Sequence, residues 1–269
     1  MDRQLSRLFR HATIALLASS ASTLTLTAQA PTGMRYEFAT AGDKGEPGVG
    51  AGYVLGDTSR MEMPGSGGEY LVMKPGHLYS VHPDKREYSD SPPEALSDII
   101  GKALRATQLI VRFELSDATV TTQNLGDGDI VAGQPTRHFR LVQRFSVTVH
   151  PLIIGSTDDP PEANEIVTDY WVAKNLQLPR NPLVELIASA PSALAQQDRA
   201  FARKSSGARD SLFTGMPLKI KVTTRKKGEH PKVAETFEVT TLTRTAVSPS
   251  QFEIPAGYRR TDDLSIHSM

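Results

Sequence analysis

The chain has 269 residues, with 30 basic and 30 acidic side chains and no cysteine. This balance excludes the basic footprint of a nucleic-acid-binding protein, and the lack of cysteine excludes disulfides and thiol chemistry. Without the first 30 residues, roughly 240 would remain with a net charge of about −2, enough for one domain with a sizeable core.

The first 30 residues have the order of segments that is typical of a secretory signal peptide. Three arginines give a positive start, Ala12–Ala18 is an uncharged apolar run, and the residues up to Ala30 are small and polar. The apolar run is far shorter than the roughly 20 residues that span a bilayer. We therefore expect a signal peptide over residues 1–30, cleaved between about Ala21 and Ala30, and a periplasmic or secreted protein. The alternative is a flexible N-terminal tail.

Residues 31–269 are expected to form a single β-rich domain that ends in a frayed tail over residues 262–269. Met34–Phe38 reads as a first strand, and the glycine-rich residues Gly42–Gly52 read as a mobile loop. Short β-favouring runs with turn residues between them then predict a meander of hairpins. These runs are Tyr53–Leu55, Ser59–Met63, Glu69–Met73, His77–Val81 and Arg86–Tyr88.

A helix is predicted after the meander, because five apolar residues between Leu96 and Leu104 recur at helical spacing and form one stripe. Strand signals resume at residues 109–115 and 118–125. Gly126–Asp129 reads as a tight acidic turn, with calcium binding as the minor alternative. A long alternating run, His138–Val149, follows it.

An acidic, proline-rich loop is predicted over Gly155–Asn164, and a strand over Glu165–Ala173. A second helix is predicted to start at Asn181 and Pro182, to break or restart at Pro191, to continue through residues 192–204, and to end at Gly207. Leu218–Thr223 and Val233–Arg244 predict a hairpin, and residues 252–258 close the core. The expected fold is mainly β with two helices, built on an antiparallel sheet or barrel.

Several segments resemble a family of secreted bacterial proteins, domain of unknown function 4412. The resemblance runs loosely over residues 34–258, and the order of the segments carries it. The loop at 155–164 and the helix at 192–204 depart from the family pattern. The matching segments are Gly56–Pro64, Tyr70–Met73, Leu78–Pro83, Ala132–Phe139, Asp169–Leu176 and Phe237–Tyr258. The family in turn resembles the lipoprotein carriers LolA and LolB, which implies a curved antiparallel sheet, or half-open barrel, wrapped round helices.

Motifs for catalysis are not found in the sequence. His77 and His82 are five residues apart and would face opposite sides of one strand, and no His-Glu-x-x-His or Gly-x-Ser-x-Gly motif is present. We therefore predict no catalytic residue, no metal ligand and no cofactor. A hydrolase built from scattered residues stays open as a third alternative.

Binding is the remaining class of function. Methionines pack adaptably and suit an apolar cavity, and aromatic residues lie near them in the sequence; ordinary core packing is the alternative for each. The candidate ligand-binding residues are Met61, Met63, Met73, Tyr70, Tyr79 and Trp171.

The leading hypothesis is a non-catalytic extracytoplasmic protein that binds or carries a hydrophobic ligand, such as a lipid, an acyl chain or a lipidated protein. No integral membrane segment and no nucleic-acid partner are expected. The alternative is an envelope module with a filled core that binds a protein partner through its sheet edge or helix face. The oligomeric state and the ligand's identity do not follow from the sequence.

Overall fold

The computed structural model describes residues 31–43, 47–62, 67–92, 111–151, 160–193, 195 and 198–261. The predicted signal peptide, the helix predicted between Leu96 and Leu104, Met63 and the predicted tail lie outside these residues, as does the first half of the loop predicted at 155–164. The loop prediction is wrong for residues 162–164, which belong to strand β9. Among the described residues, no helix is long and apolar enough to cross a membrane.

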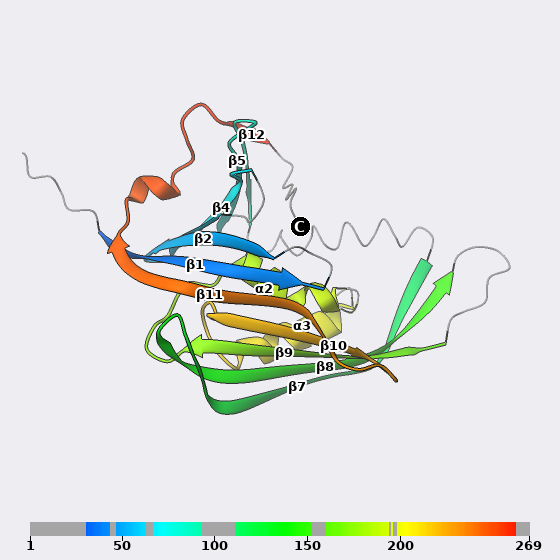
Figure 1. Ribbon diagram of the computed structural model, residues 1–269. Coiled ribbons are helices and arrows are strands. Elements are labelled where there is room, and N and C mark those ends of the chain that lie inside the picture. The colour runs from blue at the N-terminus through cyan, green and yellow to red at the C-terminus, as the bar shows by residue number, and fades with distance from the viewer. Residues whose placement is uncertain are drawn as a thin grey trace, which may run out of the picture.

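The described chain forms one 12-stranded sheet with the strand order β12-β6-β5-β4-β3-β2-β1-β11-β10-β9-β8-β7. The sheet is open, because β12 and β7 are its two edges, and it curves round the helices (Figure 1). The strands are β1 (Thr32–Gly42), β2 (Gly48–Leu55), β3 (Thr58–Glu62), β4 (Tyr70–Lys74), β5 (His77–His82), β6 (Glu87–Ser91), β7 (Val111–Val131), β8 (Gln134–Pro151), β9 (Glu162–Ala173), β10 (Lys219–Lys226), β11 (Lys232–Ala246) and β12 (Arg259–Thr261).

The predicted hairpins are confirmed. Strands β2 to β6 pair antiparallel in chain order, which is the predicted meander. Strands β7, β8 and β9 form a second antiparallel run, and β10 pairs with β11 as expected. The two runs join where β1 pairs antiparallel with β11, so segments about 200 residues apart in sequence complete one sheet.

The prediction of a mobile loop over Gly42–Gly52 is wrong for its second half, which forms strand β2. An ideal Cβ on Gly50 would lie 2.3 Å from Cζ of Phe38, and one on Gly52 would lie 2.1 Å from Cζ of Tyr36. These glycines therefore leave room for two aromatic rings of the neighbouring strand, which is a packing role of glycine within a strand.

The turn predicted at Gly126–Asp129 is also wrong. These residues belong to β7, which continues to Val131, and the turn consists of Ala132 and Gly133. Both turn residues have positive φ, 47° and 74°, as a two-residue type I′ hairpin requires. The residues before the turn do not all pair regularly, and the register of β7 against β8 shifts between Asn124 and Gly126 and between Asp127 and Ile130.

The described residues contain two α-helices, α2 (Pro182–Ser189) and α3 (Arg199–Asp210), with a 3-10 turn over Ala190–Ser192 after the first. The break at Pro191 is therefore confirmed. The predicted end at Gly207 is wrong, because α3 runs through that residue to Asp210. The second helix starts where the side chain of Asp198 accepts a hydrogen bond from the Phe201 backbone N–H at 2.8 Å.

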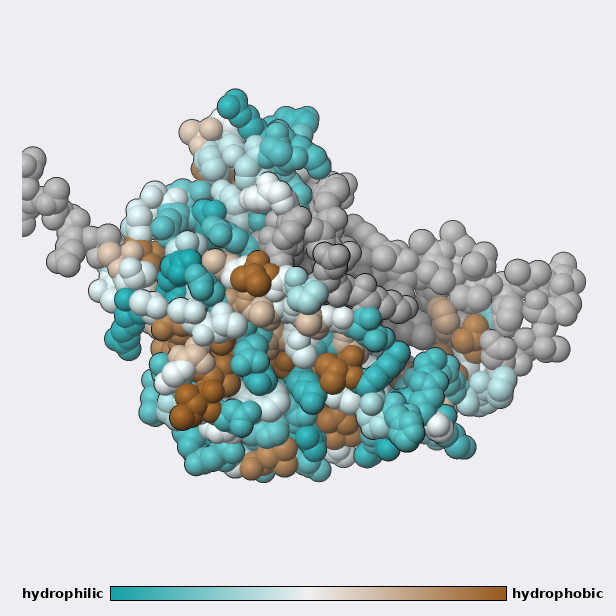
Figure 2. Space-filling view, in the orientation of Figure 1, coloured by the Kyte–Doolittle hydropathy of each residue, from teal (hydrophilic) through white to brown (hydrophobic). Residues whose placement is uncertain are grey.

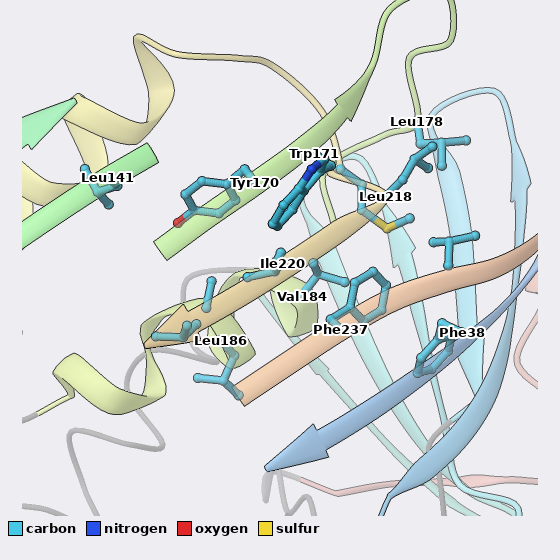
Figure 3. Close-up of a cluster of buried hydrophobic side chains, with 14 of the residues drawn as sticks. Phe38, Leu141, Tyr170, Trp171, Leu178, Val184, Leu186, Leu218, Ile220 and Phe237 are labelled. Carbon is cyan, nitrogen blue, oxygen red and sulfur yellow. The ribbon is translucent and has the colours of Figure 1, made fainter. Parts of the chain in front are cut away.

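The main core lies on the face of the sheet that carries α2 and α3, which we call the inner face (Figure 3). Helix α2 packs against β10 and β11, and α3 packs against β7 and β8. Strand residues such as Phe38, Ile220 and Phe237 meet Val184 and Leu186 of α2 there, all of them buried. The structure is thus mainly β with two α-helices in its described part, on one open curved sheet.

A second, smaller cluster lies on the opposite, outer face. Tyr70, Val72 and Val81 of the meander pack there against Val247 and Phe252 from the segment that follows β11. This segment contains the short 3-10 helix Pro249–Phe252 and ends in β12, which pairs parallel with β6. The C-terminal part of the described chain therefore crosses the meander's outer face and covers one edge of the sheet.

Candidate ligand-binding site

A pocket opens between the two helices and the strands behind them. Its floor is apolar and belongs to the main core, because Tyr170 of β9 and Ile220 of β10 lie beneath it. Its walls come from Val184 and Ala188 of α2 and from Phe213, just after α3. The pocket therefore connects the surface at the seam between the helices with the inner face of the sheet. The surface over the strands in Figure 2 is a mixture of polar and apolar residues.

Two arginines and two carboxylates surround the mouth of this pocket. Arg180 Nε lies 2.7 Å from Glu185 Oε1, and Arg180 Nη2 lies 2.9 Å from Asp210 Oδ1. Arg209 contacts the same two carboxylates at 3.3 and 3.1 Å. Because each arginine is shared by both acids, the four groups form one ring of ion pairs that joins α2 to the end of α3.

The interior of the pocket is narrow, with room for about one water molecule. Burial raises the pKa of the Tyr170 phenol well above its ordinary value, so the hydroxyl is neutral beside the apolar walls. Beneath the start of α2, the buried Asn181 side chain donates to Tyr36 Oη at 3.4 Å and to Met61 Sδ at 3.2 Å. These weak bonds attach the helix start to β1 and β3.

Two predicted ligand residues lie on the inner face. Met61 of β3 is fully buried and Met73 of β4 is 6% exposed, and both belong to the main core. Each thioether has a polar neighbour, Asn181 for Met61 and the Ser59 hydroxyl for Met73 at 3.8 Å. The third predicted methionine, Met63, lies outside the described residues.

Tyr70 and Tyr79 lie on the outer face, away from Met61 and Met73. Tyr70 is buried in the outer cluster, with the guanidinium of Arg60 3.7 Å from the centre of its ring. Tyr79 packs against the same cluster and stacks on His77 at 5.7 Å. The structure therefore divides the predicted residues between two faces, and the binding role of each stays a prediction.

Trp171 also lies on the outer face, because its neighbour Tyr170 points to the inner one and side chains alternate along a strand. At this end of the sheet it still contacts residues of the main core. It stacks on His138 of β8 with the ring centres 4.4 Å apart, and Lys219 Nζ of β10 lies 5.2 Å from its ring. An ideal Cβ on Gly128 would lie 2.8 Å from Trp171 Cδ1. The bulged end of β7 thus covers the indole.

Residues at the pocket mouth were not predicted. Arg180, Glu185, Arg209 and Asp210 are charged residues in or beside helices, and in sequence they resemble any solvated helix face. Glu185 and Arg209 are 24 positions apart, so their pairing depends on how α2 and α3 meet. Arg180 and Glu185 are five positions apart, which is not the i,i+3 or i,i+4 spacing of an ion pair on a helix.

Four histidines in the described residues each face a carboxylate of a neighbouring segment. The distances are 2.9 Å for His77 to Asp90, 2.8 Å for His82 to Glu69, 2.9 Å for His138 to Asp169 and 3.3 Å for His150 to Glu114. His77 and His82 do face opposite sides of β5, as predicted, since they contact Tyr79 and Ser80 respectively. Within the described part of the chain, no group of three or more potential metal ligands gathers.

A second hollow, on the outer face, differs in character. It is lined by Glu37, Arg60, Glu62 and Glu69 beside the glycine-rich part of β2. Carboxylates dominate this lining, which suits water or cations better than an apolar chain. The seam between α2 and α3 is therefore the better candidate for an apolar ligand.

Comparisons with known proteins give several structural neighbours, and two of them show how low the sequence identity is. No family model and no curated protein matches the sequence, so the resemblance to domain of unknown function 4412 is not confirmed. An uncharacterized conserved protein from Thermus thermophilus aligns with 12% identity and a TM-score of 0.38, over 85% of this chain and 89% of that one. A LolA superfamily protein from Nitrosomonas europaea aligns with 9% identity and a TM-score of 0.28, over 84% and 91%.

Proposed function

We propose that this protein binds or carries an apolar or amphipathic ligand, such as a lipid or acyl chain, at the seam between α2 and α3, without covalent chemistry. The observation that carries the proposal is the pocket whose apolar floor is continuous with the inner face and whose mouth holds two arginines and two carboxylates. In keeping with the predicted signal peptide, the protein would act in the periplasm or outside the cell.

The distribution of polarity suits a ligand with two ends. An acyl chain would lie against Val184, Ala188 and Phe213, which line the pocket, and burial of each methylene group contributes about 0.8 kcal/mol. A polar headgroup would stay at the mouth beside Arg180 and Arg209, where charged partners of both signs are present.

Entry requires the helices to separate, because the pocket now holds about one water molecule. The ion pairs that close the mouth are half-exposed, with Arg180 49% and Asp210 46% accessible, and exposed pairs contribute only about 0–1 kcal/mol each. Helix α2 has eight residues, too few to be stable without its packing. Within the described residues, the seam is therefore a part of the inner-face cover that can open at low cost.

A cross-link tests whether opening of the seam is needed. The chain has no cysteine, so Glu185→Cys with Arg209→Cys can be joined by a short bis-maleimide across the seam. The matched control joins Lys219→Cys to Glu238→Cys, which replaces a 3.0 Å ion pair between two paired strands. Palmitate and phospholipid vesicles are offered to each protein, and bound lipid is measured by native mass spectrometry.

We expect lipid on the wild type and on the linked control, and weaker binding on the unlinked seam variant, which lacks the Arg209 contact to the headgroup. The linked seam variant should bind at least about tenfold less than the same variant without the link, which corresponds to about 1.4 kcal/mol. A second variant, Ala188→Leu, fills the pocket, whereas Ala200→Leu adds the same volume on an exposed part of α3. Equal lipid uptake by Ala188→Leu and Ala200→Leu, or no uptake by the wild type, would contradict the proposal.

One observation favours a second candidate function, an interaction module with a filled core. The inner face is closely packed in its described part, with Tyr36, Phe38, Met61 and Phe237 fully buried. Under this alternative, neither palmitate nor vesicles transfer lipid to the wild type, and the cross-link across the seam has no effect on partner binding.

A further inference from the structure

The two ends of the sheet differ in how the edge strand is covered. Strand β6 is covered by β12, which is tied to it by ion pairs from Arg259 to Glu87 and from Arg260 to Asp90. Strand β7, at the other edge, pairs with β8 and with no other strand of the described residues. It lies along the lower border of the sheet in Figure 1, and residues 121–127 are exposed. An open edge is a template for another strand.

The centre of β7 is regular and uncharged. Thr119–Asn124 pairs with β8 without interruption, and irregularities in the register lie on both sides of it, one of them at Asp117 with a positive φ of 53°. The sequence Thr-Val-Thr-Thr-Gln-Asn is rich in β-favouring residues. The stretch offers about 20 Å of free strand edge, at about 3.4 Å per residue.

Carboxylates flank this stretch at both ends. Glu114 and Asp117 precede it, and Asp127 and Asp129 follow it. The side chains of Glu114 and Asp127 are 67% and 82% exposed. The groups that pair with them are His150 of β8 and Lys174 after β9. Both come from the side of β7 that faces β8 and not from its free edge. Among the β7 side chains that the structure describes, the charged ones that flank the stretch are therefore negative.

This charge pattern disfavours a second copy of the chain as the occupant. An antiparallel copy centred on Thr119–Asn124 would bring Glu114 and Asp117 of one chain toward Asp129 and Asp127 of the other, and opposed like charges destabilise a strand pair. A strand with an uncharged β-favouring centre and basic residues at both ends would place opposite charges together instead.

We propose that the free edge of β7 is a docking site for an extended segment of a different polypeptide, which adds as a further strand along Thr119–Asn124 and carries lysine or arginine at both flanks. Main-chain hydrogen bonds supply the pairing, and the flanking charges select the partner. The site lies at the sheet edge and does not depend on the proposed ligand pocket.

The probe is a synthetic peptide, acetyl-Lys-Thr-Val-Thr-Val-Thr-Val-Lys-amide, compared with the same peptide carrying glutamate in place of both lysines. Amide hydrogen exchange of the purified full chain is followed for each peptide concentration. We expect the lysine peptide to slow exchange within Thr119–Asn124 and leave β6 unchanged, and the glutamate peptide to bind at least about tenfold more weakly.

Strand addition has a further signature, because only one side of the added strand bonds to β7. Two lysine peptides are N-methylated at alternate residues, one on each side of the strand, and one of them should lose binding while the other keeps it. The variant Asp117→Asn with Asp127→Asn should lose the preference for lysine over glutamate. The matched control, Asp57→Asn with Glu229→Gln, neutralises exposed carboxylates in two hairpin turns outside β7 and should keep it.

Three outcomes would overturn the proposal. The first is unchanged exchange in Thr119–Asn124 up to the solubility limit of the lysine peptide. The second is equal binding of the two N-methylated peptides, which would show contact without strand pairing. The third is a dimer of the chain in sedimentation analysis with Thr119–Asn124 already protected, which would assign the edge to a second copy. Loss of lipid uptake at the α2–α3 seam would leave all three readouts unaffected.

Discussion

Gly50 and Gly52 set the distance between β1 and β2 side chains on the inner face. The rings of Phe38 and Tyr36 lie across these two positions, at distances that no Cβ atom tolerates. Both rings are fully buried, so neither can turn outward without exposing a large apolar surface. The glycines therefore act through the volume they leave free, and their φ angles are ordinary for a strand.

The substitution Gly52→Ala should destabilise the protein, by about 1–3 kcal/mol or more, because the added methyl group overpacks the core against Tyr36. Gly207→Ala is the matched control. That position is exposed, lies within α3, and has nothing within 4 Å of an added Cβ, so alanine should stabilise the helix by about 1 kcal/mol. Urea unfolding followed by circular dichroism measures both. Equal effects of the two substitutions would contradict the packing role of Gly52.

This role could not be predicted from sequence, and the reason is physical. A run of glycines between Gly48 and Gly52 has the composition of a loop, and the rings that require it come from positions 36 and 38 on another strand. The contact exists only once β1 and β2 are paired in the observed register, Tyr36 with Gly52 and Phe38 with Gly50.

At the scale of elements, the break between α2 and α3 shapes the candidate site. Helix α2 ends at Ser189, and α3 begins ten residues later with its own cap at Asp198. The second helix therefore returns along a different line, and its end brings Arg209 and Asp210 to Glu185. One continuous helix would carry these residues far from α2.

Asp198 should therefore contribute to the stability of α3, although its side chain is exposed. Asp198→Ala removes the acceptor for the Phe201 N–H and should lower the free energy of unfolding by about 1 kcal/mol, whereas Asp198→Asn keeps a capping acceptor and should be nearly neutral. Hydrogen exchange resolves the effect at α3, where Asp198→Ala should speed exchange in the first turn. Equal protection in both variants would show that the cap is not formed in solution.

Most strands and the helix break follow from local patterns, such as the alternation over Leu218–Thr223 and the proline at 191. The turn after β7 does not. Gly126–Asp129 has better turn composition than Ala132 and Gly133, but the chain places an alanine at φ 47°, which L-residues adopt rarely. Long-range pairing of β7 with β8 overrides the local preference and moves the turn by several residues.

At the scale of the whole molecule, β4 connects the two cores. Its side chains alternate, so Leu71 and Met73 enter the main core while Tyr70 and Val72 enter the outer cluster. All four are buried, so β4 is buried on both faces. The segment after β11 buries the outer face, because its Val247 and Phe252 cover the meander.

Substitutions at neighbouring positions of β4 should therefore remove packing from different cores, but each variant should unfold in one transition. Leu71→Ala should cost about 2–5 kcal/mol and Val72→Ala about 1.5–3 kcal/mol, each within a single cooperative unfolding transition. Calorimetry checks this by comparing the calorimetric enthalpy with the van't Hoff enthalpy. A separate low-temperature transition in Val72→Ala alone would show that the outer cluster unfolds independently.

The overall architecture could be predicted only in part. Local runs indicated mainly β structure with a meander, a later run of strands and a closing hairpin, and the resemblance to carriers implied the curved sheet round helices. The pairing of β1 with β11 joins residues such as Phe38 and Val239, and no local pattern contains that information. The seam between the helices depends on the same tertiary arrangement, which is why its four charged residues were missed.

The position of Trp171 has a spectroscopic consequence. It is the chain's only tryptophan, it is 8% exposed, and it stacks on His138 beneath Gly128. Its fluorescence therefore reports on the outer face at the β7–β8–β9 end of the sheet. Ligand entry on the inner face should leave the emission wavelength unchanged, whereas detachment of the β7 bulge should shift it to the red as water reaches the indole.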